Sequence, residues 1–352
     1  MTHAPWIRTR RGIAAVALAA LAAAAGAGAH ADTPYSIVAR WKTGGAGGWD
    51  YLLVDPGKAR LFVTRGDRVE VLATADGAAL GRIANTQGVH GVALAPELKR
   101  GFTSNGRANT VTEFDYDSLA TLREVPVTGQ NPDAILYEPA SRRLFTFNGR
   151  SKNATVLDAT TLAVVATVPV PDKPEFAVAG EHGRVYVNIE SEPGRLVVID
   201  AAKAAVVADW PLPGCDSPTG LALDAKRGHL FSVCDGNVMA VTDAATGKQL
   251  ARVAIGAGPD AAEVDAARGL VFSSNGEGTL SIVRADAKAG FPVLGTLPTQ
   301  RGARTMALDP TTGRIFLVTS EFGPPPPATP EQPHPRPVPV PETFTVLVAA
   351  PR

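Results

Sequence analysis

One pattern recurs seven times along this chain, at intervals of 40 to 45 residues. Each copy has a short apolar strand, a tight turn, and a second strand of the form R-L-F-V. The aromatic residue of that second strand marks the period, at Phe62, Phe102, Phe145, Tyr186, Phe231, Phe272 and Phe316. Self-similarity at this spacing is typical of propellers and stacked arrays, so the repeat constrains the fold more than any other feature.

The segments inside one period have the character of β-strands. The fifth period contains four short β-rich runs separated by turns rich in Gly, Asp, Lys and Arg: TGLALD at 219–224, HLFSV at 229–233, VMAVTD at 238–243 and QLARVAIG at 249–256. No stretch combines a sustained 3.6-residue period with caps at both ends, and 35 glycines and 29 prolines disfavour a helical bundle. Four strands per period predict a four-stranded antiparallel propeller blade.

The two ends of the array complete each other. The last repeat supplies only three strands, of which the third is TFTVLVA at 343–349, whereas YSIVARW at 35–41 is a spare strand before the first repeat. We therefore predict an all-β fold, a single seven-bladed β-propeller over 32–352. The N-terminal strand joins the last blade and closes the ring, which covers strand edges that would otherwise template aggregation.

Residues 1–31 have the pattern of a cleaved signal peptide. Three arginines and no acidic residue come first, followed by an apolar run at 12–29 and an A-x-A cleavage motif at 29–31. The run is short and lacks a basic stop-transfer flank, so we expect no membrane span. The mature protein is then periplasmic or secreted. Arg10-Arg11 also suits twin-arginine export, so the general secretory and twin-arginine routes both stay open.

The charge balance limits the partners of the whole chain. Lysine plus arginine is 34 and aspartate plus glutamate is 34, so removing the three arginines of the signal leaves 31 − 34 = −3. Any affinity for nucleic acid must therefore come from a local patch. Hydrophobic residues at 45% and charged residues at 19% indicate a globular protein.

A ring of polar residues is expected at one mouth of the central channel. The first strand of a blade lines the channel, and equivalent positions at its start hold Asp50, His90, Asp133, Glu175, Thr219, Asp260 and Arg304. One interpretation is a binding site, in which Asp133, Glu175, Asp260 and His90 hold a divalent cation. The other is that the acids cap strands and tie neighbouring blades.

The loops joining second to third strands lie on the same face, and several contain Asn-Gly. Their candidate binding residues are Asn105, Arg107, Asn148, Arg150, Lys152 and Asn275. Asn-Gly is a favourable turn sequence, so the asparagines can be explained by turn chemistry alone. The arginines are less required by a turn, and loops on a rigid scaffold are where binding residues concentrate.

Two further features are specific to single blades. Cys215 and Cys234 both fall in the fifth repeat, and after export we expect a disulfide, with free thiols or metal ligation as alternatives. Residues 323–342 contain ten prolines and form an insertion in the last blade. This extended segment is a flap beside the channel mouth, a docking tag for a partner, or a tolerated stiff insertion.

The second strands end in FVTR at 62–65, FTSN at 102–105, FTFN at 145–148, VYVN at 185–188 and FSSN at 272–275. These endings resemble the YVTN-type repeats of bacterial YncE-like secreted β-propellers, and the resemblance covers residues 35–350. It implies a seven-bladed propeller in the periplasm or at the cell surface. One relative is reported to bind single-stranded DNA, and most have no assigned activity. The proline-rich insertion departs from the plain repeat.

Three functions follow, in order of preference. The first is an exported, monomeric, non-catalytic binding or scaffold propeller that uses the channel-mouth face for a small ligand or a cell-envelope protein. The second is a hydrolase of the lactonase kind that uses a divalent cation, the only cofactor we consider. The third is single-stranded DNA binding through Arg107, Arg150 and Lys152. No G-x-S-x-G, P-loop, G-x-G-x-x-G or H-E-x-x-H motif is present, and no catalytic residue is assigned.

Overall fold

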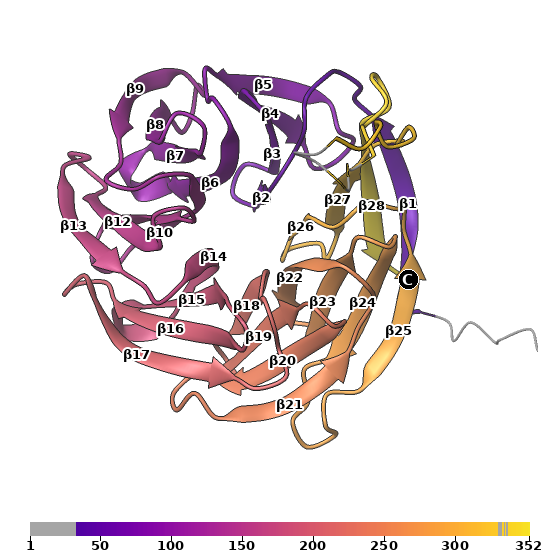
Figure 1. The fold of residues 1–352 in the computed structure, drawn as a ribbon. Helices are drawn as coiled ribbons and strands as arrows, with labels where there is room; N and C mark the ends of the chain where they lie inside the picture. The colour runs from indigo at the N-terminus through magenta and orange to yellow at the C-terminus, as the bar shows by residue number, and fades with distance from the viewer. Residues whose placement is uncertain (1–32, 330–332, 334, 336) are drawn as a thin grey trace, which may run out of the picture. The chain divides into compact units, whose positions relative to one another are not determined.

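The regular structure is almost entirely β-strand. The computed structural model describes residues 33–329, 333, 335 and 337–352, and the expected signal peptide lies outside them. In the described residues, 28 strands form seven four-stranded antiparallel sheets, and the only helices are two short 3-10 turns, η1 (Pro96–Leu98) and η2 (Glu181–Gly183). The sheets follow one another around a central axis, as Figure 1 shows. The predicted fold is confirmed.

Each blade runs from an innermost strand outward. The first three blades are β2 (Leu52–Asp55), β3 (Arg60–Arg65), β4 (Arg68–Ala73) and β5 (Ala79–Ala84); β6 (Val89–Ala95), β7 (Arg100–Asn105), β8 (Thr110–Asp115) and β9 (Thr121–Pro126); and β10 (Pro132–Glu138), β11 (Arg143–Asn148), β12 (Asn153–Asp158) and β13 (Val164–Pro169). The next three are β14 (Lys173–Ala179), β15 (Arg184–Glu190), β16 (Gly194–Asp200) and β17 (Ala205–Leu212); β18 (Leu221–Asp224), β19 (His229–Cys234), β20 (Val238–Asp243) and β21 (Gln249–Ala254); and β22 (Pro259–Asp265), β23 (Leu270–Asn275), β24 (Thr279–Arg284) and β25 (Val293–Pro298). The seventh is β26 (Met306–Leu308), β27 (Ile315–Thr319), β28 (Thr345–Pro351) and β1 (Tyr35–Lys42).

The seventh blade joins the two ends of the described chain. Strand β1 pairs antiparallel with β28, from Tyr35 opposite Pro351 to Lys42 opposite Thr345. Tyr35 is 1% exposed, and its ring packs edge-on against Phe272 of the sixth blade at 5.1 Å. The N-terminal strand therefore closes the ring as predicted.

The aromatic residue that marks each repeat is a packing residue between blades. All seven are buried. Phe62 of the first blade, for example, lies 6.1 Å from Phe114 of the second and shares a core cluster with Val69, Val71 and Ile83. The period is visible in the sequence because every blade must fill the same gap to its neighbour.

A disulfide joins Cys215, in the loop that leads into β18, to Cys234 at the end of β19. Both residues are fully buried, in a core cluster with Leu196, Leu212 and Leu221. This confirms the expected pairing. The bond fixes the loop that leads into the fifth blade against the second strand of that blade.

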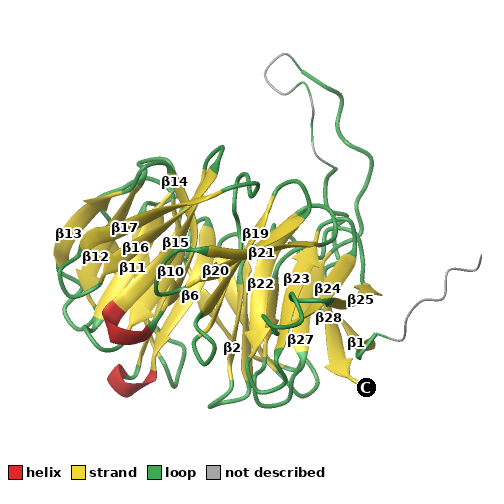
Figure 2. Cartoon of the chain, turned by 90° about the horizontal axis from the view of Figure 1, so that it is seen from below, coloured by secondary structure: helices red, strands yellow, loops and turns green. Residues whose placement is uncertain are grey.

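The proline-rich insertion is anchored at its base. Phe322 and Pro339 form an antiparallel bridge, Gly323 N–H donates to the Val338 carbonyl at 2.9 Å, and Val340 N–H donates to the Glu321 carbonyl at 2.8 Å. In Figure 2, the described parts of the insertion beyond this base project from one face of the blades. The base is therefore a continuation of the seventh blade.

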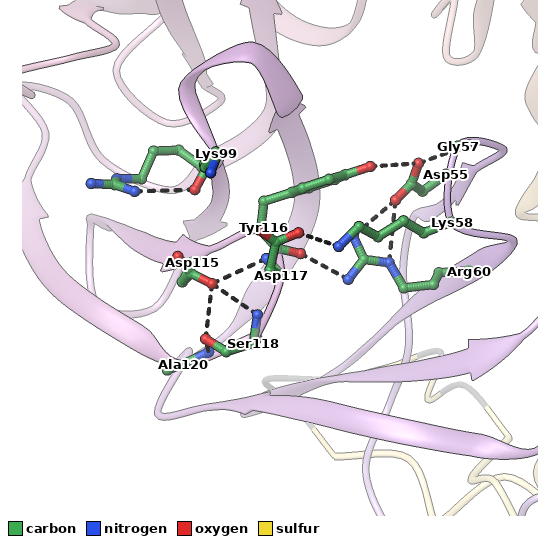
Figure 3. A network of polar contacts seen from close by, with 11 residues as sticks. Asp55, Gly57, Lys58, Arg60, Lys99, Asp115, Tyr116, Asp117, Ser118 and Ala120 are labelled. Carbon is green, nitrogen blue, oxygen red and sulfur yellow. Dashed lines mark hydrogen bonds and ion pairs between the residues drawn. The ribbon is translucent and has the colours of Figure 1, made fainter.

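A buried polar network ties the first two blades together (Figure 3). It lies on the face opposite the expected channel mouth, where the turns show nothing unusual in sequence. Arg60 Nη2 lies 2.8 Å from Asp55 Oδ2, and both side chains are 5% exposed. Arg60 Nη1 also donates to the Tyr116 carbonyl at 2.8 Å, while the Tyr116 hydroxyl donates to Asp55 Oδ1 at 3.0 Å. One aspartate thus holds groups from both blades.

Candidate functional site

Three of the predicted ring residues meet at the channel mouth. Asp50 precedes β2, His90 lies in β6 and Asp133 in β10, so three successive blades each contribute one side chain. His90 Nδ1 lies 2.5 Å from Asp50 Oδ2 and 3.5 Å from Asp133 Oδ1. One potential ligand atom from each residue falls within 4.8 Å of the others. The structure thus brings together an imidazole and two carboxylates.

Asp133 is the least satisfied member of this Asp50–His90–Asp133 cluster. Its side chain is 10% exposed, and its Oδ1 accepts no hydrogen bond. Burial raises the pKa of Asp133 to about 8; the nearby His90 opposes this rise, whereas Glu175 and Asp50 add to it. Burial disfavours a charged His90, but the hydrogen bond to Asp50 and the neighbouring carboxylates outweigh it and raise the pKa of His90 to about 9.

Glu175 of the fourth blade belongs to a separate group. Lys173 Nζ lies 2.9 Å from Glu175 Oε2 and 2.5 Å from Glu190 Oε2, and the Tyr51 hydroxyl donates to Glu175 Oε1 at 3.4 Å. Burial, followed by the charge of Glu190, raises the pKa of Glu175. Because Lys173 already neutralises this carboxylate, Glu175 is less suited to a cation than the sequence suggests.

Asp260 and Arg304 form the third group, with Arg304 Nε 3.4 Å from Asp260 Oδ2. Burial raises the pKa of Asp260 to about 7 against the opposing charge of Arg304. Thr219, the remaining ring member, donates from Oγ1 to the Pro259 carbonyl of the next blade at 3.3 Å. The ring therefore contains both ties between blades and a cluster that remains incompletely paired.

A cavity of about 440 Å³ lies over His90 and Asp50. Arg107 and Arg150 line it, as do Asn109, Gln130 and Asn131. Both arginines are exposed, and no contact within the described residues pairs either guanidinium. The cavity therefore offers two unpaired cations beside the Asp50–His90–Asp133 cluster.

The other loop candidates do not reach this cavity. Asn105, Asn148 and Asn275 are fully buried and donate to Thr or Ser hydroxyls of the third strand in their own blades. Lys152 Nζ is 2.7 Å from Asp172. The glycine of the Asn105-Gly106 turn is required by the close approach of His90, because a Cβ on Gly106 would lie 2.5 Å from His90 Nε2. Glycine here lets the loop approach the imidazole.

Arg65 occupies the same repeat position as the buried asparagines, and sequence reasoning missed its role. Its side chain is fully buried over the Phe344 ring, and it donates to the carbonyls of Gly44, Gly45 and Ala46 at 3.1–3.2 Å. These carbonyls belong to the loop that carries Trp49 and Asp50. The sequence feature that could have revealed this role is the arginine that ends FVTR, at a position where four other repeats have asparagine.

A second cavity, of about 350 Å³, adjoins the first through Gly48 and Trp49. Arg301, Arg304, Phe322 and the insertion residues Pro337 and Pro339 line it. Trp49 lies 5.2 Å from Phe344 and 6.1 Å from Phe322, which agrees with a packing role for this tryptophan. The base of the insertion thus extends the channel-mouth face.

The lower part of the channel is apolar. A cavity of about 380 Å³ is lined by Leu53, Val92, Leu94, Leu136 and Phe176 among others, and it shares no lining residue with the cavity over His90. Tyr51 lines its upper end and packs edge-on against Phe176 at 5.1 Å. The polar cluster therefore lies above an aromatic contact that spans from the first blade to the fourth.

Glu263, on the innermost strand β22, gives a pH-dependent prediction. Burial raises its pKa from 4.5 to about 8, opposed only by a hydrogen bond from the Leu308 N–H. A carboxyl with a raised folded-state pKa supports folding fully at or below pH 4.5 and loses that support as the pH rises through 8. Glu263→Gln stays neutral, so we expect its Tm to match that of the wild type near pH 4.5 and to exceed it at pH 9. Thermal melts from pH 4 to 9 measure this; a difference independent of pH would count against the assignment.

Comparison with known proteins supports the fold. No family model and no curated protein matches this sequence. Among solved structures, hydrazine synthase of Kuenenia stuttgartiensis matches with a TM-score of 0.68 at 14% identity, covering 83% of this chain and 95% of that one. The WD40 repeats of RRP9 give 0.70 at 11%, covering 90% and 97%. A chain of the mitotic checkpoint complex gives 0.72 at 14%, covering 98% and 99%. At these identities the likeness shows the β-propeller fold alone.

In the part of the chain that the structure describes, no helix has the length and apolar character needed to span a membrane.

Proposed function

We propose that this protein is an exported, monomeric, non-catalytic binding propeller of the YVTN-repeat type, and that its ligand is a small anion held in the cavity over His90. The observation that carries the proposal is the pair of guanidiniums, Arg107 and Arg150, which have no partner among the described residues and share one cavity with His90. Arginine forks suit carboxylate and phosphate groups. The Cys215–Cys234 disulfide supports an oxidising compartment.

The cavity supports a small molecule better than a nucleic acid strand. Lys152 and Lys173 on this face are already paired with carboxylates, and Trp49 packs against Phe322 and Phe344. A single-stranded DNA site needs a cationic track with free aromatic faces for base stacking. The described loops offer two free cations within a cavity of about 440 Å³.

Calorimetric titration in EDTA tests the proposal with four probes: succinate, citrate, glucose 6-phosphate and a short oligothymidylate. We expect binding of at least one small anion, weakened about tenfold or more in Arg107→Ala and in Arg150→Ala, because a hydrogen bond to a charged group contributes roughly 1.5–3 kcal/mol. Arg82→Ala, on the exposed outer strand β5, is the control and should bind normally. Binding of none of the small anions, either in EDTA or with a divalent metal ion added, or binding indifferent to both arginines, would contradict the proposal. Tight, salt-sensitive binding of the oligonucleotide alone would favour the DNA alternative.

A further inference from the structure

The Asp50–His90–Asp133 cluster leaves one buried carboxyl oxygen, Asp133 Oδ1, without a hydrogen-bond partner. His90 Nδ1 can carry only one hydrogen, and the contact with Asp50 Oδ2 at 2.5 Å uses it. Asp133 Oδ1 lies 3.5 Å from the same nitrogen and accepts no hydrogen bond, although its side chain is nine-tenths buried. Buried polar atoms are normally paired, so this orphaned oxygen, aimed at His90, needs an explanation.

We propose that Asp50, His90 and Asp133 bind a divalent transition-metal ion. An ion between His90 Nδ1 and the two carboxylates contacts all three groups at once, which a proton on Nδ1 does not do. Ligands of a tetrahedral ion at 2.0–2.2 Å lie about 3.3–3.6 Å apart. The His90–Asp133 separation of 3.5 Å already has this value, and Asp50 needs to move back by about one ångström.

The ligand types select the class of ion. One imidazole and two carboxylates suit zinc, manganese, iron or cobalt, whereas calcium takes six to eight oxygen ligands. The structure also revises the ligand set expected from sequence. Lys173 holds Glu175 and Arg304 is paired with Asp260, so Asp50 takes their place as the third ligand.

The site is placed to serve the proposed function, on which this part of the inference rests. Asp50 and His90 both line the cavity that contains Arg107 and Arg150. Three protein ligands leave at least one coordination position for an exogenous group. An anion in the cavity therefore coordinates the ion with one oxygen and reaches the arginines with others, which narrows the ligand class to metal-chelating carboxylates or phosphates.

Cobalt absorption spectroscopy on the full mature chain tests the metal site directly. After EDTA treatment and dialysis, titration with Co²⁺ is expected to give visible d–d bands that saturate at one ion per chain and are lost on adding Zn²⁺. Loss of an outer-shell partner already lowers metal affinity about 10- to 100-fold, so Asp133→Asn is expected to lower the affinity by about 100-fold or more. Asp50→Asn is the second ligand variant, in case Asp133→Asn is poorly folded. Asp209→Asn, at an exposed ion pair with Arg195, is the control and should keep full affinity.

Each outcome decides the inference separately from the proposed function. Absence of the bands in the folded wild type, or equal affinity in Asp133→Asn and Asp50→Asn, would overturn the metal site. Anion binding in EDTA together with absence of cobalt bands would leave the binding function standing and remove the metal. Cobalt binding that depends on Asp133, with no anion bound either in EDTA or in the presence of the metal ion, would support the metal site and contradict the anion-binding function.

Discussion

A chain that begins at Thr43, without strand β1, is expected to unfold at least about 10 °C below a chain that begins at Thr33. Removing β1 takes away Tyr35, which packs against Phe272, and Trp41, which packs against Phe316 at 5.6 Å. Truncating one buried aromatic side chain costs about 3–5 kcal/mol, so losing the buried Tyr35 together with the half-buried Trp41 removes about 5 kcal/mol or more. That is comparable with the whole stability of many domains.

The shortened chain is also expected to self-associate, because it exposes the full edge of β28. Calorimetry and light scattering on both chains measure the two effects. Val38→Ser is the matched control, since this β1 side chain is 54% exposed and its substitution should leave the Tm nearly unchanged. A monomeric shortened chain with an unaltered melting transition would show that β1 does not close the ring.

Replacing Asp55 by alanine is expected to lower the free energy of unfolding by about 3–5 kcal/mol. The substitution strands the Arg60 guanidinium in a site where only 5% of its side chain is exposed, and it removes the acceptor of the Tyr116 hydroxyl. Removing one partner of a buried pair is more harmful than removing both, because the remaining charge stays desolvated. Urea denaturation of the wild type and the variant measures the loss.

Two matched variants separate this explanation from a general effect of mutation. Asp117→Ala, in the neighbouring surface ion pair with Lys58, should cost less than about 1 kcal/mol because both partners are exposed. The double variant Asp55→Leu with Arg60→Met should recover much of the stability, since it removes both charges. If the double variant were as unstable as the sum of the losses in the single variants Asp55→Leu and Arg60→Met, desolvation of Arg60 would not be the cause.

The fold was predictable because every blade packs against its neighbour through the same set of side chains. The repeated aromatic, the strand-ending turns and the spare N-terminal strand all encode contacts that recur at a fixed spacing, and the structure places them as expected. The YVTN-like endings also have a physical meaning that the sequence alone did not supply. Asn105, Asn148 and Asn275 are buried ties between the second and third strands.

The site was predictable only as a set of positions. Topology places the ring residues at one mouth of the channel, but which side chains pair depends on neighbours outside the repeat pattern, such as Lys173 against Glu175. The roles of Arg65 and of the Asp55–Arg60 pair were missed for the same reason. Each depends on contacts with a loop or a neighbouring blade whose distance the sequence does not show.

We propose the channel mouth of this propeller as its binding site. The most direct measurement is a crystal structure of the mature chain grown with zinc chloride and succinate, with anomalous diffraction data collected at the zinc edge. We expect an anomalous peak about 2.0–2.2 Å from His90 Nδ1 and from carboxylate oxygens of Asp50 and Asp133, with succinate between the ion and Arg107 or Arg150. Zinc and succinate found only elsewhere, for example in the apolar cavity beneath Tyr51, would contradict it.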